Sequence, residues 1–64
     1  MTASEIDRAA RLLAQYIGPL AGVLTKKAAQ KARNLPEFYQ LLSEHVTAKA
    51  ERSRFLYEAM NPPA

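Results

Sequence analysis

Ser43 and His45 are the residues that most resemble a catalytic pair, because a histidine can activate a nearby serine as a nucleophile. They lie two positions apart on a segment with helical periodicity, so their side chains point in different directions. No third group that would orient the histidine is evident. We therefore expect no catalysis at this pair. His45 falls on an apolar helix face and is interpreted as a hydrogen-bonded core residue, with pH sensing as the alternative.

Other patterns that would indicate an enzyme or a metal site are missing. The chain has no cysteine and one histidine, so it has neither a disulfide nor a thiolate or histidine cluster for a metal ion. Its six acidic residues include no pair that the pattern places in an apolar pocket, where acid–base catalysis would shift a pKa. Gly18 and Gly22 are a helical turn apart and follow no strand, unlike a phosphate-binding loop. The sequence predicts no enzyme, no cofactor and no metal.

Phosphate binding is the other chemistry to consider, because the formal net charge is +3. The one basic cluster on a predicted helix consists of Lys26, Lys27, Lys31 and Arg33. These cations either form a solvated helix end, which the helix dipole favours, or contact phosphates in a helix-turn-helix. The helix that would enter the groove presents a polar face made of Glu37, Gln40, Ser43 and Glu44. Its two glutamates would repel a nucleic acid. Nucleic-acid binding is therefore the alternative function.

The elements that position these residues meet at Gly18 and Pro19, within the apolar stretch Tyr16–Leu24. Gly18 accepts backbone angles that other residues avoid, and Pro19 suits the first position of a new helix. In a continuous helix, the Pro19 ring would crowd the carbonyl of Gln15 and cost roughly 3 kcal/mol. We therefore predict a hinge between two helices here.

Apolar residues at spacings of three and four predict an all-α fold, a compact bundle of four short helices. The expected ranges are about 3–17, 19–33, 35–46 and 48–60. Thr2 with Glu5, and Asn34 with Glu37, have the capping-box spacing that marks a helix start. Thr47 is the expected cap of the last helix.

Residues 2–60 are expected to form a single domain, and 61–64, with two prolines, a flexible tail. The longest uncharged run, Leu12–Thr25, has 14 residues, fewer than the roughly 20 of a membrane-spanning helix. The polar start does not resemble a signal peptide, and the lack of cysteine fits a reducing compartment. We expect a cytoplasmic protein with no membrane span.

The first turn and a half of the second predicted helix is apolar around nearly its whole circumference. Leu24 and the alanines form an arc of small apolar side chains, whereas Leu20 and Val23 lie on the lysine side. Both flanks need a cover, either two neighbouring helices of the same chain or one neighbour and a second subunit. A core of this size rarely supplies more than about 3–5 kcal/mol of folding stability, and small domains commonly gain the rest by associating with another chain. We expect a homo-oligomer, with a dimer favoured, or docking to a signalling protein. The candidate interface residues are Tyr16, Leu20, Val23, Lys27, Arg54 and Tyr57.

Several charged or aromatic residues lie off the main apolar faces. Arg8 and Arg11 share the polar face of the first helix. Arg52 points into the apolar face of the last helix, and three roles stay open for it: packing of its stem, an ion pair with a glutamate, or a partner contact. Tyr57, with Arg54 nearby, is expected to be exposed. Both residue types are enriched at interfaces.

The run Tyr16-Ile-Gly-Pro-Leu-Ala, continued by residues 23–24 and 26–29, resembles a short helical accessory domain of bacterial multidomain signalling proteins. Further matching positions are Leu35, Phe38, Tyr39, Leu41, Leu42 and residues 51–56. The resemblance covers about residues 10–56. It implies a non-catalytic interaction domain, often C-terminal to a serine/threonine protein kinase domain. It supplies no catalytic residue, so any kinase activity would lie in a part of a parent protein outside this chain.

Overall fold

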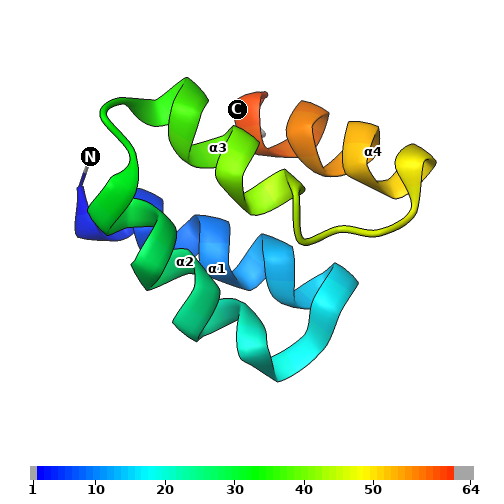
Figure 1. Ribbon diagram of the computed structural model, residues 1–64, viewed down its shortest axis with the longest axis horizontal. Coiled ribbons are helices and arrows are strands. Elements are labelled where there is room, and N and C mark those ends of the chain that lie inside the picture. The colour runs from blue at the N-terminus through cyan, green and yellow to red at the C-terminus, as the bar shows by residue number, and fades with distance from the viewer. Residues whose placement is uncertain (1, 62–64) are drawn as a thin grey trace.

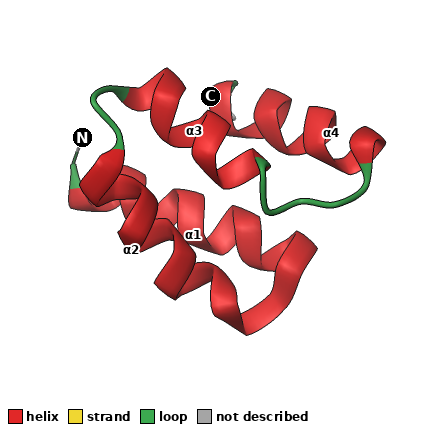
Figure 2. Ribbon diagram, in the orientation of Figure 1, coloured by secondary structure: helices red, strands yellow, loops and turns green. Residues whose placement is uncertain are grey.

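Helices α1 and α2 form an antiparallel hairpin that packs against α3 and α4 (Figure 1). The computed structural model describes residues 2–61, and over that range every regular element is helical (Figure 2). The elements are α1 (Ala3–Ile17), the 3₁₀ turn η1 (Gly18–Leu20), α2 (Ala21–Lys31), α3 (Leu35–Ser43) and α4 (Lys49–Met60). Their packing fits within 27 × 27 × 18 Å. The predicted all-α class and compactness are confirmed.

α1 begins at a complete capping box. The Glu5 backbone N–H donates to Thr2 Oγ1 at 3.2 Å, and the Thr2 backbone N–H donates to Glu5 Oε1 at 2.9 Å. These bonds satisfy two of the amide groups that a helix start leaves without partners. The hydrogen bond from the Thr2 backbone also lowers the pKa of Glu5, because it favours the charged carboxylate.

The chain reverses direction at Gly18, whose φ of 82° and ψ of −154° are angles that essentially only glycine adopts. Pro19 follows inside η1, where the Ala21 N–H donates to the Gly18 carbonyl. α2 therefore begins at Ala21, and the predicted start at Pro19 was wrong by one tight turn. An i to i+3 turn needs no donor at Pro19, so proline fits it without loss.

Two other helices end earlier than predicted. α2 ends at Lys31, not at residue 33, because Ala32 is extended, with ψ of 140°. This leads the chain to Asn34, whose Oδ1 accepts from the Glu37 N–H at 2.9 Å and caps α3. α3 ends at Ser43, not at residue 46, because the amides of His45 and Val46 donate to carbonyls three residues back, in a tight turn.

The loop from α3 to α4 is held by Arg52. Its Nε donates to the Val46 carbonyl at 3.1 Å, and its Nη2 donates to the Thr47 carbonyl at 3.3 Å. Arg52 thus ties the loop to α4, a role outside the three left open by the sequence. α4 starts at Lys49 with Ala48 as its cap, so the prediction of Thr47 was wrong. Residues 62–64 of the predicted tail lie outside the described residues.

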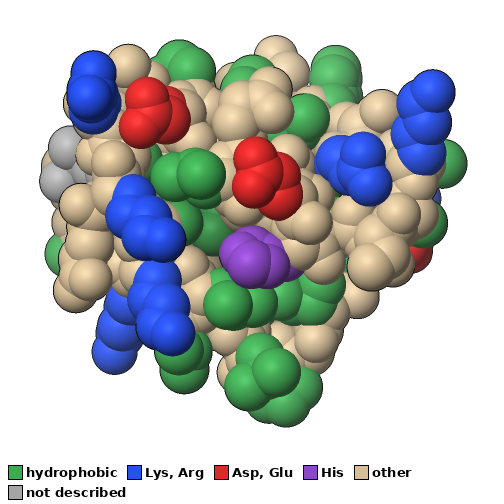
Figure 3. All heavy atoms as spheres, in the orientation of Figure 1, with side chains coloured by type: hydrophobic (Ala, Val, Ile, Leu, Met, Phe, Trp, Pro, Cys, Tyr) green, Lys and Arg blue, Asp and Glu red, His purple; other side chains and the backbone are tan. Residues whose placement is uncertain are grey.

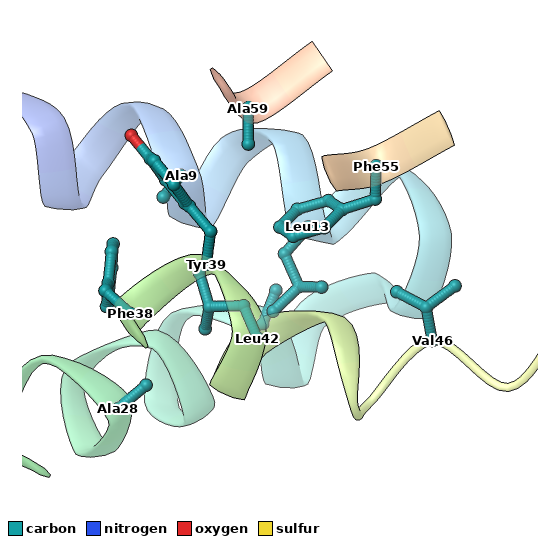
Figure 4. Packing of buried hydrophobic residues seen from close by; sticks show 10 residues of the cluster. Ala9, Leu13, Ala28, Phe38, Tyr39, Leu42, Val46, Phe55 and Ala59 are labelled. Carbon is teal, nitrogen blue, oxygen red and sulfur yellow. The ribbon is translucent and has the colours of Figure 1, made fainter. Parts of the chain in front are cut away.

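The core lies between the hairpin and the other two helices, and its large side chains come from α1, α3, α4 and the loop (Figure 4). Its largest fully buried apolar side chains are Leu13, Phe38, Leu42, Val46 and Phe55. Burying each such side chain contributes about 1.5–3 kcal/mol. From α2 the core takes only small side chains, those of Ala21, Thr25 and Ala28.

Ser43 and His45 exchange the environments expected from the sequence. Ser43 was predicted on the polar face of its helix but is 1% exposed, and its Oγ donates to the Gln40 carbonyl at 2.7 Å. His45 was predicted in the core but is exposed. Both differences follow from the end of α3 at Ser43, because the chain turns before it reaches His45.

Arg8 connects α1 to the end of α4. Its Nη2 donates to the Glu58 carbonyl at 2.9 Å, and its Nη1 donates to the Ala59 carbonyl at 3.2 Å. These carbonyls lie in the last turn of α4, where the helix leaves them without partners. Arg8 is therefore half-buried in a helix contact and does not simply belong to a solvated face.

Candidate docking surface

Two large apolar side chains at the start of α2 lie on the outside of the molecule. Leu20, which immediately precedes α2, is 66% exposed, and Val23 is 54% exposed. The buried side of the helix holds Ala21, Thr25 and Ala28 instead. Small side chains allow α2 to approach α1 closely, but they leave the bulkier residues facing water. The first turn of α2 thus exposes apolar area that the chain itself does not cover.

A row of side chains continues from Leu20 along α2. Leu24, Lys27 and Lys31 follow at helical spacings of four, seven and eleven residues, which places them on one face. Leu24 is half-buried, and both lysines are exposed. The row therefore changes from apolar near the hairpin turn to basic near the end of α2.

A hollow of about 240 Å³ lies between this row and the end of α3. Its lining residues are Leu24, Lys27, Ala28 and Lys31 from α2, with Leu41, Glu44 and His45 opposite. Figure 3 shows this face of the molecule, with green apolar side chains and a red acidic side chain around the purple histidine, and blue Lys and Arg side chains down the left side and at the upper right. We call the exposed residues Leu20 and Val23, together with this hollow, the α2 surface.

The basic residues predicted to contact anions remain exposed but are not one compact group. Lys26, Lys27 and Lys31 are on α2, whereas Arg33 lies past its end, contrary to the prediction that it was helical. Of these cations, Lys27 and Lys31 line the hollow. Within residues 2–61 the ion pair is Asp7 with Arg11, at 3.1 Å, so none of the four cations is neutralised by a paired carboxylate.

Tyr16 lies with α4 and not with the exposed apolar residues. Its hydroxyl donates to Glu58 Oε1, and its ring meets Phe55 edge-on with centroids 6.0 Å apart. The hydrogen bond to the Glu58 carboxylate raises the pKa of Tyr16, because it favours the protonated phenol, and burial adds to the rise. Tyr16 is half-buried, so we assign it a structural contact between α1 and α4.

Tyr57 and Arg54 belong to a different part of the surface. Tyr57 is 70% exposed on α4, and Arg54 is exposed on the same helix. Tyr57 lines a groove of about 550 Å³ between α1 and α4, beside Leu12 and Gln15. Five of the six predicted interface residues are thus divided between two surfaces, and Tyr16 belongs to neither. Of these six, Leu20, Val23 and Lys27 belong to the α2 surface.

Sequence reasoning missed the residues that shape the hollow. Leu24 was grouped with the small core-facing residues of its helix, although its spacing from Leu20 predicts the same face. Leu41 and His45 were expected on the apolar face of a longer third helix. No sequence signal places them opposite Lys27, because that requires the packing of α3 on α2.

Ser43 and His45, the residues that most resembled a catalytic pair, are not arranged as a nucleophile and its base. Ser43 Oγ is buried and already donates to the Gln40 carbonyl, so it is not poised beside His45. Within residues 2–61, no three His, Cys, Asp or Glu side chains gather closely enough to hold a metal ion. No helix of that range is long and apolar enough to cross a membrane. The α2 surface thus consists of the exposed Leu20 and Val23 beside an apolar hollow that two lysines border.

A family model described as "Domain of unknown function (DUF8082)" matches residues 4–62. The matched range includes the whole α2 surface. No curated protein matches the chain, and no solved structure matches it.

Proposed function

The chain belongs to the DUF8082 family, and we propose that it is a non-catalytic protein–protein interaction module that binds through the α2 surface. The observation that carries this proposal is the exposure of Leu20 and Val23, at 66% and 54%, in a domain with few large core residues. Exposed apolar residues grouped beside polar ones are typical of interaction sites. The module either self-associates, as a dimer first, or docks another protein.

The size of the apolar patch supports weak and reversible binding. Full burial of a leucine or valine side chain contributes about 1.5–3 kcal/mol, so covering the exposed fractions of Leu20 and Val23 yields about 2–4 kcal/mol. Association costs at least about 4 kcal/mol in lost translational and rotational freedom. The patch needs further contacts, and the adjoining hollow with Lys27 and Lys31 supplies them.

We also propose that the module acts in the cytoplasm within a bacterial multidomain signalling protein. The support is the resemblance carried by Tyr16–Ala21, including the glycine at which the chain reverses. Any kinase activity would then belong to another domain of the parent protein. The genes that encode family members test this: a kinase or other signalling domain upstream supports the proposal, and consistently isolated domains contradict it.

Light scattering after size exclusion, from about 1 mM down to 10 μM protein, tests self-association. Self-association through the α2 surface predicts an average mass above the monomer that falls on dilution, and a constant monomer for the double variant Leu20→Ser/Val23→Ser. A wild-type protein that stays monomeric throughout leaves docking of another protein as the function. The matched control is Tyr57→Ser/Met60→Ser, which removes two exposed apolar residues from α4. An equal decrease of the average mass in both variants would mean that the α2 surface has no specific role in self-association.

The alternative function is sequence-indifferent nucleic-acid binding. Two observations favour it: the four basic residues of the cluster are exposed, and none forms an ion pair within residues 2–61. Fluorescence anisotropy with labelled DNA and RNA should then give an affinity that falls steeply with salt, with a log–log slope of up to roughly −3.6 for four phosphate contacts. No binding at low ionic strength would exclude it.

A further inference from the structure

We propose that the occupant of the α2 surface is an acidic amphipathic helix from a different protein, which lies along the hollow between α2 and α3. This inference rests on the proposed docking function and names the partner. It follows from the shape of the surface, its charge and the poor fit of a second copy.

The shape of the α2 surface suits a short helix. Leu24, Lys27 and Lys31 form one wall of the hollow, and Leu41 and His45 form the other. From residue 24 to residue 31 the hollow follows α2 for about 10 Å, or two helical turns. A helix laid in such a groove inserts apolar side chains at i and i+4 and keeps its polar face outward. Leucines of the partner would meet Leu24 and Leu41.

The charge of the α2 surface requires acidic residues on that helix. Residues 8–36 contain six Lys or Arg and no Asp or Glu. Lys27 and Lys31 line the hollow at i and i+4, a spacing at which like charges repel each other along a helix. Glu44 is the acidic residue in the lining, and it forms no ion pair within residues 2–61. Two carboxylates spaced at i and i+4 on the partner would meet both lysines.

A second copy of the chain fits this surface less well. In a two-fold dimer the same patch meets itself, so the cations of one α2 would face those of the other. Only Glu44 from each copy would oppose them, and like charges brought together across an interface disfavour the pair. The exposed Leu20 and Val23, in turn, fit a protein better than a phosphate backbone, which has no apolar surface to cover them.

The test is a display selection of random helical peptides on the intact domain, with depletion on the Leu20→Ser/Val23→Ser variant. We expect selected peptides to carry leucine at i and i+4 and glutamate or aspartate at a similar spacing. The strongest peptides, fluorescently labelled, should lose at least about tenfold in affinity for Lys27→Glu/Lys31→Glu. The matched control, Lys49→Glu/Arg54→Glu, removes the same charge from exposed positions of α4 and should leave the affinity within about twofold.

Each other outcome overturns a stated part of the proposal. Neutral or basic peptides that still depend on Leu20 and Val23 would refute the acidic partner and keep the docking function. A concentration-dependent dimer lost in the Leu20→Ser/Val23→Ser variant, with no selected peptide, would make the occupant a second copy. Binding only to phosphatidylglycerol vesicles or to DNA would replace the protein partner with an anionic surface. If no peptide is selected and the domain does not self-associate, the docking function is refuted as well.

Discussion

Replacing Arg8 by methionine should destabilise the domain strongly, although the arginine falls on the polar face of α1. Its guanidinium donates to the carbonyls of Glu58 and Ala59, at 2.9 and 3.2 Å. Asn61 donates to the Tyr57 carbonyl through both its backbone N–H and its Nδ2. Arg8 thus joins Asn61 in satisfying the carbonyls at the end of α4, and it also fixes α4 against α1.

The magnitude follows from these contacts. A hydrogen bond from a charged group contributes about 1.5–3 kcal/mol when it is shielded, and we take about 1 kcal/mol for each because Arg8 is half-exposed. A cation at a helix C-terminus adds about 0.3–1 kcal/mol. The loss on Arg8→Met is therefore about 2–3 kcal/mol. This is a large fraction of the roughly 3–5 kcal/mol that so small a core supplies.

Urea and thermal unfolding followed by circular dichroism at 222 nm measure this loss. For a domain of this size we expect a midpoint temperature lower by roughly 10–20 °C. The matched control is Arg11→Met on the same helix. The Arg11 side chain is 81% exposed and pairs only with Asp7 at the surface, so its loss should cost no more than about 0.5 kcal/mol.

Equal effects of the two substitutions would refute the reasoning. The Arg8 contacts would then be no stronger than a solvated surface pair, and the attachment of α4 to α1 would have to come from the core and the Tyr16–Glu58 contact. A variant Arg8→Lys, which keeps the charge but loses the planar pair of donors, should fall between the wild type and Arg8→Met.

Three further predictions concern single sites. Gly18→Ala should destabilise the domain by about 1–3 kcal/mol because alanine is strained at φ of 82°, whereas Gly22→Ala should stabilise it by up to about 1 kcal/mol because Gly22 lies inside α2 with open space around it. Equal effects of the two substitutions in chemical denaturation would contradict the backbone angles assigned to Gly18. Thr25→Val should stabilise by about 1–2 kcal/mol, because Thr25 Oγ1 is fully buried without a hydrogen-bond partner; a loss of stability would show that the hydroxyl is bonded in solution. The hydrogen bond to Glu58 raises the pKa of Tyr16 in the folded state, so the stabilisation from this bond is complete below about pH 10, the pKa of the unfolded state, and is lost as pH rises through the folded pKa. The unfolding free energy should therefore fall less at alkaline pH in Tyr16→Phe than in the wild type, and an equal fall in both proteins would contradict the assignment.

Local chemistry made much of the fold predictable. The cap at Thr2 and the break at Gly18 are properties of a few neighbouring residues, and the structure shows α1 between them, with the bounds expected from the sequence. Asn34 likewise marks the start of α3. The ends of α2 and α3 were not predictable in this way. They depend on where Ala32 and Val46 must lie for the next element to pack, since Val46 is 1% exposed.

The candidate site also has a part that the sequence predicts and a part that depends on packing. Exposed Leu20 and Val23 follow from periodicity, because a helix with alanines on its buried side must place its larger residues elsewhere. The hollow does not, because Leu41 and His45 reach Lys27 only through the packing of α3 on α2. The role of Tyr16 was not predictable either, because its hydroxyl donates to Glu58, 42 positions away in the sequence.

The sequence by itself therefore determined the helical class, the reversal at Gly18 and the apolar excess at the start of α2, because each depends on residues within a few turns of one another. Only the tertiary structure decided that Arg8 would hold the end of α4, that His45 would face water, and that two lysines would border an apolar hollow. Those outcomes depend on distances between segments far apart in the chain, which helical periodicity does not encode.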